Sequence, residues 1–159
     1  RNRMKIILSA GIVWLISFWC IMAWLNDPER LAINSYHHTA HMMLSSNVYP
    51  EVKDLFRQGD LAFEKKEFQK AIFFFSTYLK GGTDDNSRYA HWFILLCRLA
   101  WKGADDTWRQ DMIMFLKTAP PSLQREGQYL LRTCSSPIFR IMHGQKLQRA
   151  FSLIKPNII

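Results

Sequence analysis

The sequence predicts an all-α protein in which one long apolar helix precedes a stack of antiparallel helical hairpins. Three observations indicate this class. An uncharged apolar run of twenty residues lies near the N-terminus, at 6–25. The rest of the chain repeats apolar residues at helical spacing, and it has no alternating apolar and polar runs bounded by hairpin turns. The expected helices are joined by short loops, which is typical of antiparallel neighbours.

The run at 6–25 has the length and composition of a membrane-spanning helix. Its twenty residues, at about 1.5 Å each, cover a hydrocarbon core of roughly 30 Å. Arg1, Arg3 and Lys5 precede the run, so the positive-inside rule places the N-terminus in the cytoplasm. A signal peptide is the alternative, but its apolar part is shorter and small residues mark its cleavage site. We expect a single-pass protein of the inner (cytoplasmic) membrane with a periplasmic or otherwise extracytoplasmic C-terminal domain.

This expectation divides the chain into five segments. They are a cytoplasmic basic flank at 1–5, a transmembrane helix at 6–25, a juxtamembrane helix at 26–47, a helical domain at 48–152 and a C-terminal tail at 153–159. The juxtamembrane helix begins with Asn26 or Asp27 as its N-cap and Pro28 in its first turn. It ends before Pro50, because the residue preceding a proline is disfavoured in the α conformation.

Six helices are expected within the helical domain. They occupy 51–65, 67–79, 87–101, 107–117, 122–133 and 137–151. Gly81 and Gly82 follow the second helix and indicate a C-cap. The acidic pairs at 84–85 and 105–106 precede the third and fourth helices, where carboxylates cap free N–H groups. We therefore assign these acids to capping rather than to acid–base catalysis.

The first two helices of this domain carry a spacing that can be compared with a family. Gly59 and Ala71 are small residues twelve positions apart, and Phe68 and Phe75 lie on either side of Ala71. With these residues, 55–79 resembles a tetratricopeptide repeat, a helical hairpin closed by small residues. The resemblance implies that these four residues pack the hairpin together, and that the stack holds other proteins. A generic helical bundle is the alternative.

The resemblance covers about 49–135 and weakens toward the C-terminus. Tyr78 stands where a repeat usually has a small residue. A second unit at 92–116 is degenerate, because Trp108 falls at its small position. About three or more repeats are needed for a stable array, so we expect another protein to cover part of this domain.

Aromatic side chains are the expected partner contacts. Three successive phenylalanines at 73–75 point about 100° apart around a helix, so they cannot all face one narrow groove. Exposed apolar patches usually mark an interface. The residues expected to bind a partner are Phe63, Phe73, Phe74, Tyr78, Trp92 and Trp108.

The histidines at 37, 38 and 41 are the strongest sequence candidate for chemistry. His37 and His41 are four residues apart, as a metal pair on one helix face requires. However, His38 stands where a zinc protease carries its glutamate, and no third ligand has a recognisable spacing. A polar helix face at the membrane surface is the alternative. We expect no bound metal.

The three cysteines leave two alternatives open. Cys20 lies in the apolar run, while Cys97 and Cys134 lie in the helical domain. The latter two either form a disulfide bridge or remain buried thiols, and their apolar setting together with the odd count favours thiols.

These observations predict a binding protein rather than an enzyme. The chain has no glycine-rich phosphate loop, nucleophile elbow or paired cysteine motif, so we expect no cofactor and no small-molecule substrate. Its net charge of +8 is concentrated after residue 120, which suits an anionic membrane or an acidic protein; no nucleic-acid motif accompanies it.

The expected function is that of a membrane-anchored protein–protein interaction module. Such a module serves as an accessory or scaffold subunit of a multiprotein membrane complex. It binds other subunits through its helical domain and its membrane span. The alternative is a single-pass regulator of the anti-sigma type, for which we expect a cytoplasmic head ahead of Arg1.

Overall fold

The computed structural model describes the backbone of residues 2–45, 54–81 and 86–136, and the side chains of 11–43, 54–81 and 86–136. The helices are α1 (Asn2–Leu25), α2 (Pro28–Ser45), α3 (Asp54–Glu64), α4 (Phe68–Lys80), α5 (Ser87–Lys102), α6 (Asp106–Leu116) and α7 (Pro121–Ser135). These described ranges contain no strand, so the all-α fold class is confirmed. The helix expected at 137–151, the tail at 153–159 and the acidic pair at 84–85 lie outside the described residues.

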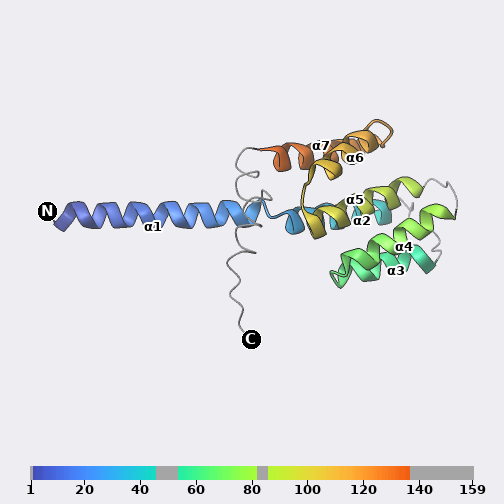
Figure 1. Ribbon diagram of the computed structural model, residues 1–159, viewed down its shortest axis with the longest axis horizontal. Coiled ribbons are helices and arrows are strands. Elements are labelled where there is room, and N and C mark those ends of the chain that lie inside the picture. The colour runs from blue at the N-terminus through green and yellow to red at the C-terminus, as the bar shows by residue number, and fades with distance from the viewer. Residues whose placement is uncertain (1, 46–53, 82–85, 137–159) are drawn as a thin grey trace.

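Helix α1 extends away from the other six helices (Figure 1). Its side chains from residue 11 to residue 21 are all exposed. The remaining helices form a bundle whose long axes run roughly along the direction of α1 (Figure 1). The molecule therefore consists of a projecting apolar helix and a helical bundle attached to one of its ends.

The core of the bundle lies where α3, α4 and α5 pack together. Phe56, Phe75 and Phe93 come from these three helices, with ring centroids 5.3–5.7 Å apart. All three side chains are almost fully buried. Because each buried aromatic side chain contributes roughly 1.5–3 kcal/mol, this cluster is a major source of stability. On the other side of α5, helices α6 and α7 form a second antiparallel pair (Figure 1).

Cap residues define the ends of three helices. Asp105 caps α6, since its carboxylate accepts a hydrogen bond from the Trp108 N–H at 2.6 Å. Gly81 is the C-cap of α4 and donates its N–H to Tyr78 O at 3.0 Å. Gly103 follows α5 with φ +77°, a conformation that favours glycine. The predicted capping roles of Asp105 and Gly81 are therefore confirmed.

Helix α2 corrects the expected division of the chain. The sequence separates a juxtamembrane helix at 26–47 from the helical domain, but α2 packs against α5 and α7 within the bundle. Its buried side chains are Leu31, Ala32, Ser35, Tyr36, Thr39 and Met43. Ala32, Ser35 and Thr39 are small or polar, so the sequence did not indicate that this side of the helix joins a core formed by distant parts of the chain.

On length and composition, no single helix among the searched residues qualifies as a membrane-crossing helix. The pair Gly11–Leu25 and Pro28–Met43 qualifies jointly, with a 45° bend between its two helices.

Candidate interaction surface

The α3–α4 hairpin is closed by a contact that only glycine permits. A Cβ atom placed on Gly59 would lie 2.6 Å from Cε1 of the buried Phe75 ring. Real Cβ atoms do not approach other atoms this closely, so the two helices meet at a point without a side chain. Ala71 and Phe68 are also buried. The four residues expected to pack the hairpin thus lie inside it.

Four of the six aromatic residues expected to bind a partner belong to the core instead. Phe63, Tyr78, Trp92 and Trp108 are at most 5% exposed. The Phe63 ring stacks on the Tyr36 ring of α2 at a centroid distance of 3.8 Å. Because these side chains are covered by the chain's own helices, the prediction that they contact a partner is corrected to a packing role.

The other two aromatic residues lie on the outer side of α4. Phe73 is 64% exposed and Phe74 is half-buried, with their ring centroids 5.7 Å apart. The sequence analysis did not single out five further large apolar side chains that are exposed on the bundle. These are Leu61, Trp101, Ile113, Met114 and Tyr129. Helical spacing alone would not have found them, since exposed and buried apolar residues alternate along the same helices.

Helix α2 forms side-chain hydrogen bonds with three other helices, α3, α5 and α7. The Tyr36 hydroxyl donates to the Asp60 carboxylate of α3. The Trp92 Nε1–H of α5 donates to Thr39 Oγ1 at 3.0 Å. The Ser35 hydroxyl donates to Glu126 Oε1 of α7 at 2.7 Å. This side of the bundle is therefore occupied by the chain's own helix.

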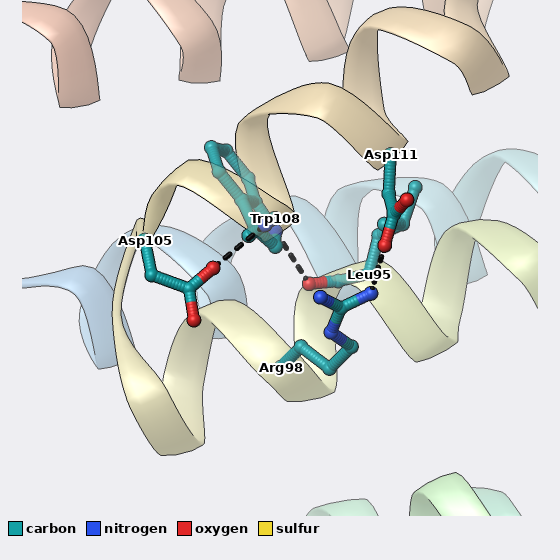
Figure 2. A network of polar contacts seen from close by, with 5 residues as sticks. All are labelled: Leu95, Arg98, Asp105, Trp108 and Asp111. Carbon is teal, nitrogen blue, oxygen red and sulfur yellow. Dashed lines mark hydrogen bonds and ion pairs between the residues drawn. The ribbon is translucent and has the colours of Figure 1, made fainter.

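Trp108 replaces the small residue that a repeat would carry between α5 and α6. Figure 2 shows its indole beside α5, where Nε1–H donates to Leu95 O at 2.9 Å. An ion pair between Arg98 of α5 and Asp111 of α6 spans the same two helices (Figure 2). The contact thus combines a buried indole, whose N–H is satisfied, with a partly exposed ion pair.

The histidines do not form a metal site in the described part of the chain. His37, His38 and His41 are exposed on α2. His37 Nδ1 lies 3.8 Å from Glu64 Oε1 of α3. Across the described ranges, no three histidine, cysteine or acidic side chains are grouped so that they could hold a metal ion.

The cysteines of the bundle are free thiols. Cys97 and Cys134 are both fully buried and unbridged, while Cys20 is exposed on α1. Burial raises the pKa of the Cys97 thiol strongly, and it raises the pKa of Cys134 to about 12 against the opposing charge of Arg109. Both groups are therefore protonated and unreactive at neutral pH.

Comparison with known proteins adds no relative. No protein-family model matches the chain, and it has no significant match among curated proteins or solved structures. Inferences about function accordingly depend on the exposed apolar surfaces of α1 and of the bundle.

Proposed function

We propose that this protein is a membrane-anchored protein–protein interaction module, an accessory or scaffold subunit of a multiprotein membrane complex. The exposed apolar surface of α1 is the observation that carries the proposal. Between residues 12 and 25, ten large apolar side chains are 46–67% exposed. Covering one such side chain is worth roughly 1.5–3 kcal/mol. Lipid, with neighbouring membrane helices, is the medium that covers all sides of an isolated helix of this kind.

The charges beside α1 support the direction of insertion. Arg1, Arg3 and Lys5 lie at its start, whereas Asp27 and Glu29 follow its end. Under the positive-inside rule, the start of α1 is cytoplasmic and the bundle is extracytoplasmic. The sequence from residue 6 to residue 25 supplies the length of a complete span.

The outer side of α4 is the proposed site for a partner subunit. Phe73 presents its ring there, with Gln69 and Lys70 exposed one turn earlier. A large aromatic side chain in a polar surrounding is typical of an interface anchor. Because these side chains of α4 are exposed, a partner has access to them without displacing any described helix.

Purification of the full chain in mild detergent tests the proposal. We expect defined subunits to co-purify, and Phe73→Asp to reduce their recovery severalfold, because it places a charge at the centre of the contact. Gln128→Asp is the matched control, since it adds the same charge at an exposed position of α7, away from the proposed site, and should leave the recovery unchanged. Equal recovery with Phe73→Asp would contradict the proposed site, and the absence of any stoichiometric partner would contradict the proposed function.

A further inference from the structure

Several segments of the bundle meet at the point where α1 leaves it. The Lys66 ammonium of the α3–α4 turn pairs with Glu29 of α2 at 2.8 Å. A Cβ atom built on Gly103, just after α5, would lie 4.0 Å from Pro28 Cγ. The α3–α4 turn and the end of α5 are thus both placed beside the α1–α2 junction, on the side of the bundle that faces α1 (Figure 1).

Two tryptophans are exposed at this end, and each has a cation over its ring. Trp24 is 61% exposed, and the Arg30 guanidinium carbon lies 3.3 Å from its ring centroid. Trp101 is 44% exposed, and Lys102 Nζ lies 4.3 Å from its ring centroid. Indole rings with neighbouring cations favour the boundary between lipid tails and headgroups.

The charges at this end are arranged so that cations remain available. The acids at this end that pair with a described lysine or arginine, or that cap a helix, are Asp27, Glu29, Glu67, Asp105 and Asp106, and Glu64 Oε1 lies 3.8 Å from His37 Nδ1. In contrast, Lys65 and Lys102 are exposed and form no ion pair with a described acid. Lys102 Nζ lies over the Trp101 ring, but neither ammonium group has a described anionic partner, so both can bind an external anion such as a phosphate.

We propose that this end of the bundle lies on the phospholipid headgroup layer. The surface consists of Trp24, Arg30, Lys65, Trp101 and Lys102, and we call it the base. Its indoles sit at the headgroup boundary and its two free lysines bind lipid phosphates. The inference rests on the proposed anchoring by α1, and it adds that the bundle itself touches the membrane. The outer side of α4 then faces sideways, toward other subunits in the same membrane.

Spin labels at three positions of the full chain test this arrangement. Cys20→Ser provides the background, because the remaining thiols are buried and protonated. Single cysteines are introduced at Glu67, which is exposed in the α3–α4 turn beside the base, at Lys80 and at Ile16 in α1. Lys80 ends α4, roughly 18 Å along the helix from the α3–α4 turn. The protein is reconstituted in phosphatidylcholine–phosphatidylglycerol vesicles, and collisions with oxygen and with a water-soluble nickel chelate are measured.

We expect the label at 67 to collide with the nickel chelate severalfold less often than the label at 80. The label at 16 should collide mainly with oxygen, which concentrates in lipid. If the label at 67 resembles the label at 80 while the label at 16 is in lipid, the base does not touch the membrane and this inference is overturned, although the anchoring stands. If the label at 16 collides with the nickel chelate as often as the label at 80, the anchoring itself is wrong and the proposed function fails with it.

A charge-reversal variant of the base provides a second test of the inference. Trp101→Ala with Lys102→Glu should raise nickel collisions at 67 to the level found at 80. Lys117→Glu, an exposed charge reversal at the end of α6, should leave them unchanged. Unchanged collisions in the first variant would overturn the role of the base, and circular dichroism checks that both variants keep their helices.

Discussion

At the scale of single residues, Gly59 sets how closely α3 and α4 approach. We predict that Gly59→Ala lowers the free energy of unfolding by about 1–3 kcal/mol, because the new methyl group would overlap the buried Phe75 ring. Gly127→Ala should cost less, since its Cβ would meet the end of the flexible, half-buried Leu116 side chain. Gly81→Ala, where the nearest atom is 3.4 Å away, should change stability by less than about 0.5 kcal/mol.

Urea unfolding in detergent, followed by circular dichroism, measures these three values. Equal effects for Gly59→Ala and Gly81→Ala would contradict the close approach of the two helices. The sequence already indicated Gly59, because its spacing to Ala71 matches a repeat. Gly127 was not indicated, since no such spacing marks the α6–α7 pair.

Lys66 holds the only left-handed backbone conformation of a non-glycine residue in the described ranges, with φ +59°. It ends α3 in a Schellman arrangement, in which Lys66 N–H bonds to Phe63 O at 2.8 Å and Glu67 N–H to Ala62 O at 2.9 Å. We predict that Lys66→Gly is about 1 kcal/mol more stable than Lys66→Ala. Both variants lose the ion pair with Glu29, so the comparison isolates the backbone term.

Thermal unfolding of the two Lys66 variants is the measurement. Equal stability would mean that the α3–α4 turn relaxes without strain. The sequence predicted a break here, between the helices expected at 51–65 and 67–79, but it did not indicate the left-handed conformation, because lysine has no preference for that region.

At the scale of elements, α2 is held in place by polar groups as well as by packing. We predict that Thr39→Val destabilises the protein by about 1–3 kcal/mol, because it leaves the buried Trp92 N–H without its acceptor at nearly constant volume. Thr77→Val is the matched control. Its hydroxyl bonds only to Phe73 O of its own helix and is not buried, so little stability should be lost.

Hydrogen exchange locates the effect of Thr39→Val. The amides of α2 should exchange faster in this variant than in the native chain, and Thr77→Val should not change them. If α2 exchange is unaltered, the Trp92–Thr39 hydrogen bond does not contribute to holding the helix.

The N-cap of α6 allows a separate test of how much a capping residue stabilises its helix. Asp105→Ala should cost about 1 kcal/mol, because the Trp108 N–H loses the carboxylate that caps it. Asp106→Ala should cost less, since that carboxylate is exposed and pairs only with Arg109. Urea unfolding compares the two, and an equal loss would assign the stabilisation to charge near the helix end instead of to the cap.

The helices themselves were largely predictable, because caps and glycine stops are local signals. The expected helices at 87–101 and 107–117 correspond to α5 and α6 with ends shifted by at most one residue. The position of α2 was not predictable in this way. Its partners Asp60, Trp92 and Glu126 lie far along the chain, and a helix that buries serine and threonine looks polar in sequence.

The same difficulty explains why two tryptophans that were expected at an interface lie in the core instead. Trp92 and Trp108 were expected at an interface because they are large aromatic residues, and Trp108 also falls where a repeat has a small residue. Both are buried, and their indole N–H groups find acceptors in Thr39 and Leu95. Composition cannot distinguish a core tryptophan from an interface tryptophan, since both require the same size and one satisfied donor.

At the scale of the whole molecule, one apolar helix projects from a bundle whose own core is well packed. The bundle buries the large aromatic side chains of its core, such as Phe56, Phe75 and Trp92, whereas the side chains of α1 from residue 11 to residue 21 remain uncovered. Because the side chains of α1 are uncovered, we expect this helix to be surrounded by a medium outside the bundle. The bundle itself has two surfaces with different expected contacts, the base toward the lipid and the outer side of α4 toward a partner.

Alkaline carbonate extraction of membranes that carry the full chain is the most direct test of the anchoring. We predict that the protein stays in the membrane pellet and floats with lipid in a density gradient. Replacing Leu15 and Ile16 by lysine should release it to the soluble fraction, since each charge at the centre of a span costs about 2.5–3.5 kcal/mol. Release of the unaltered chain by carbonate would contradict the account.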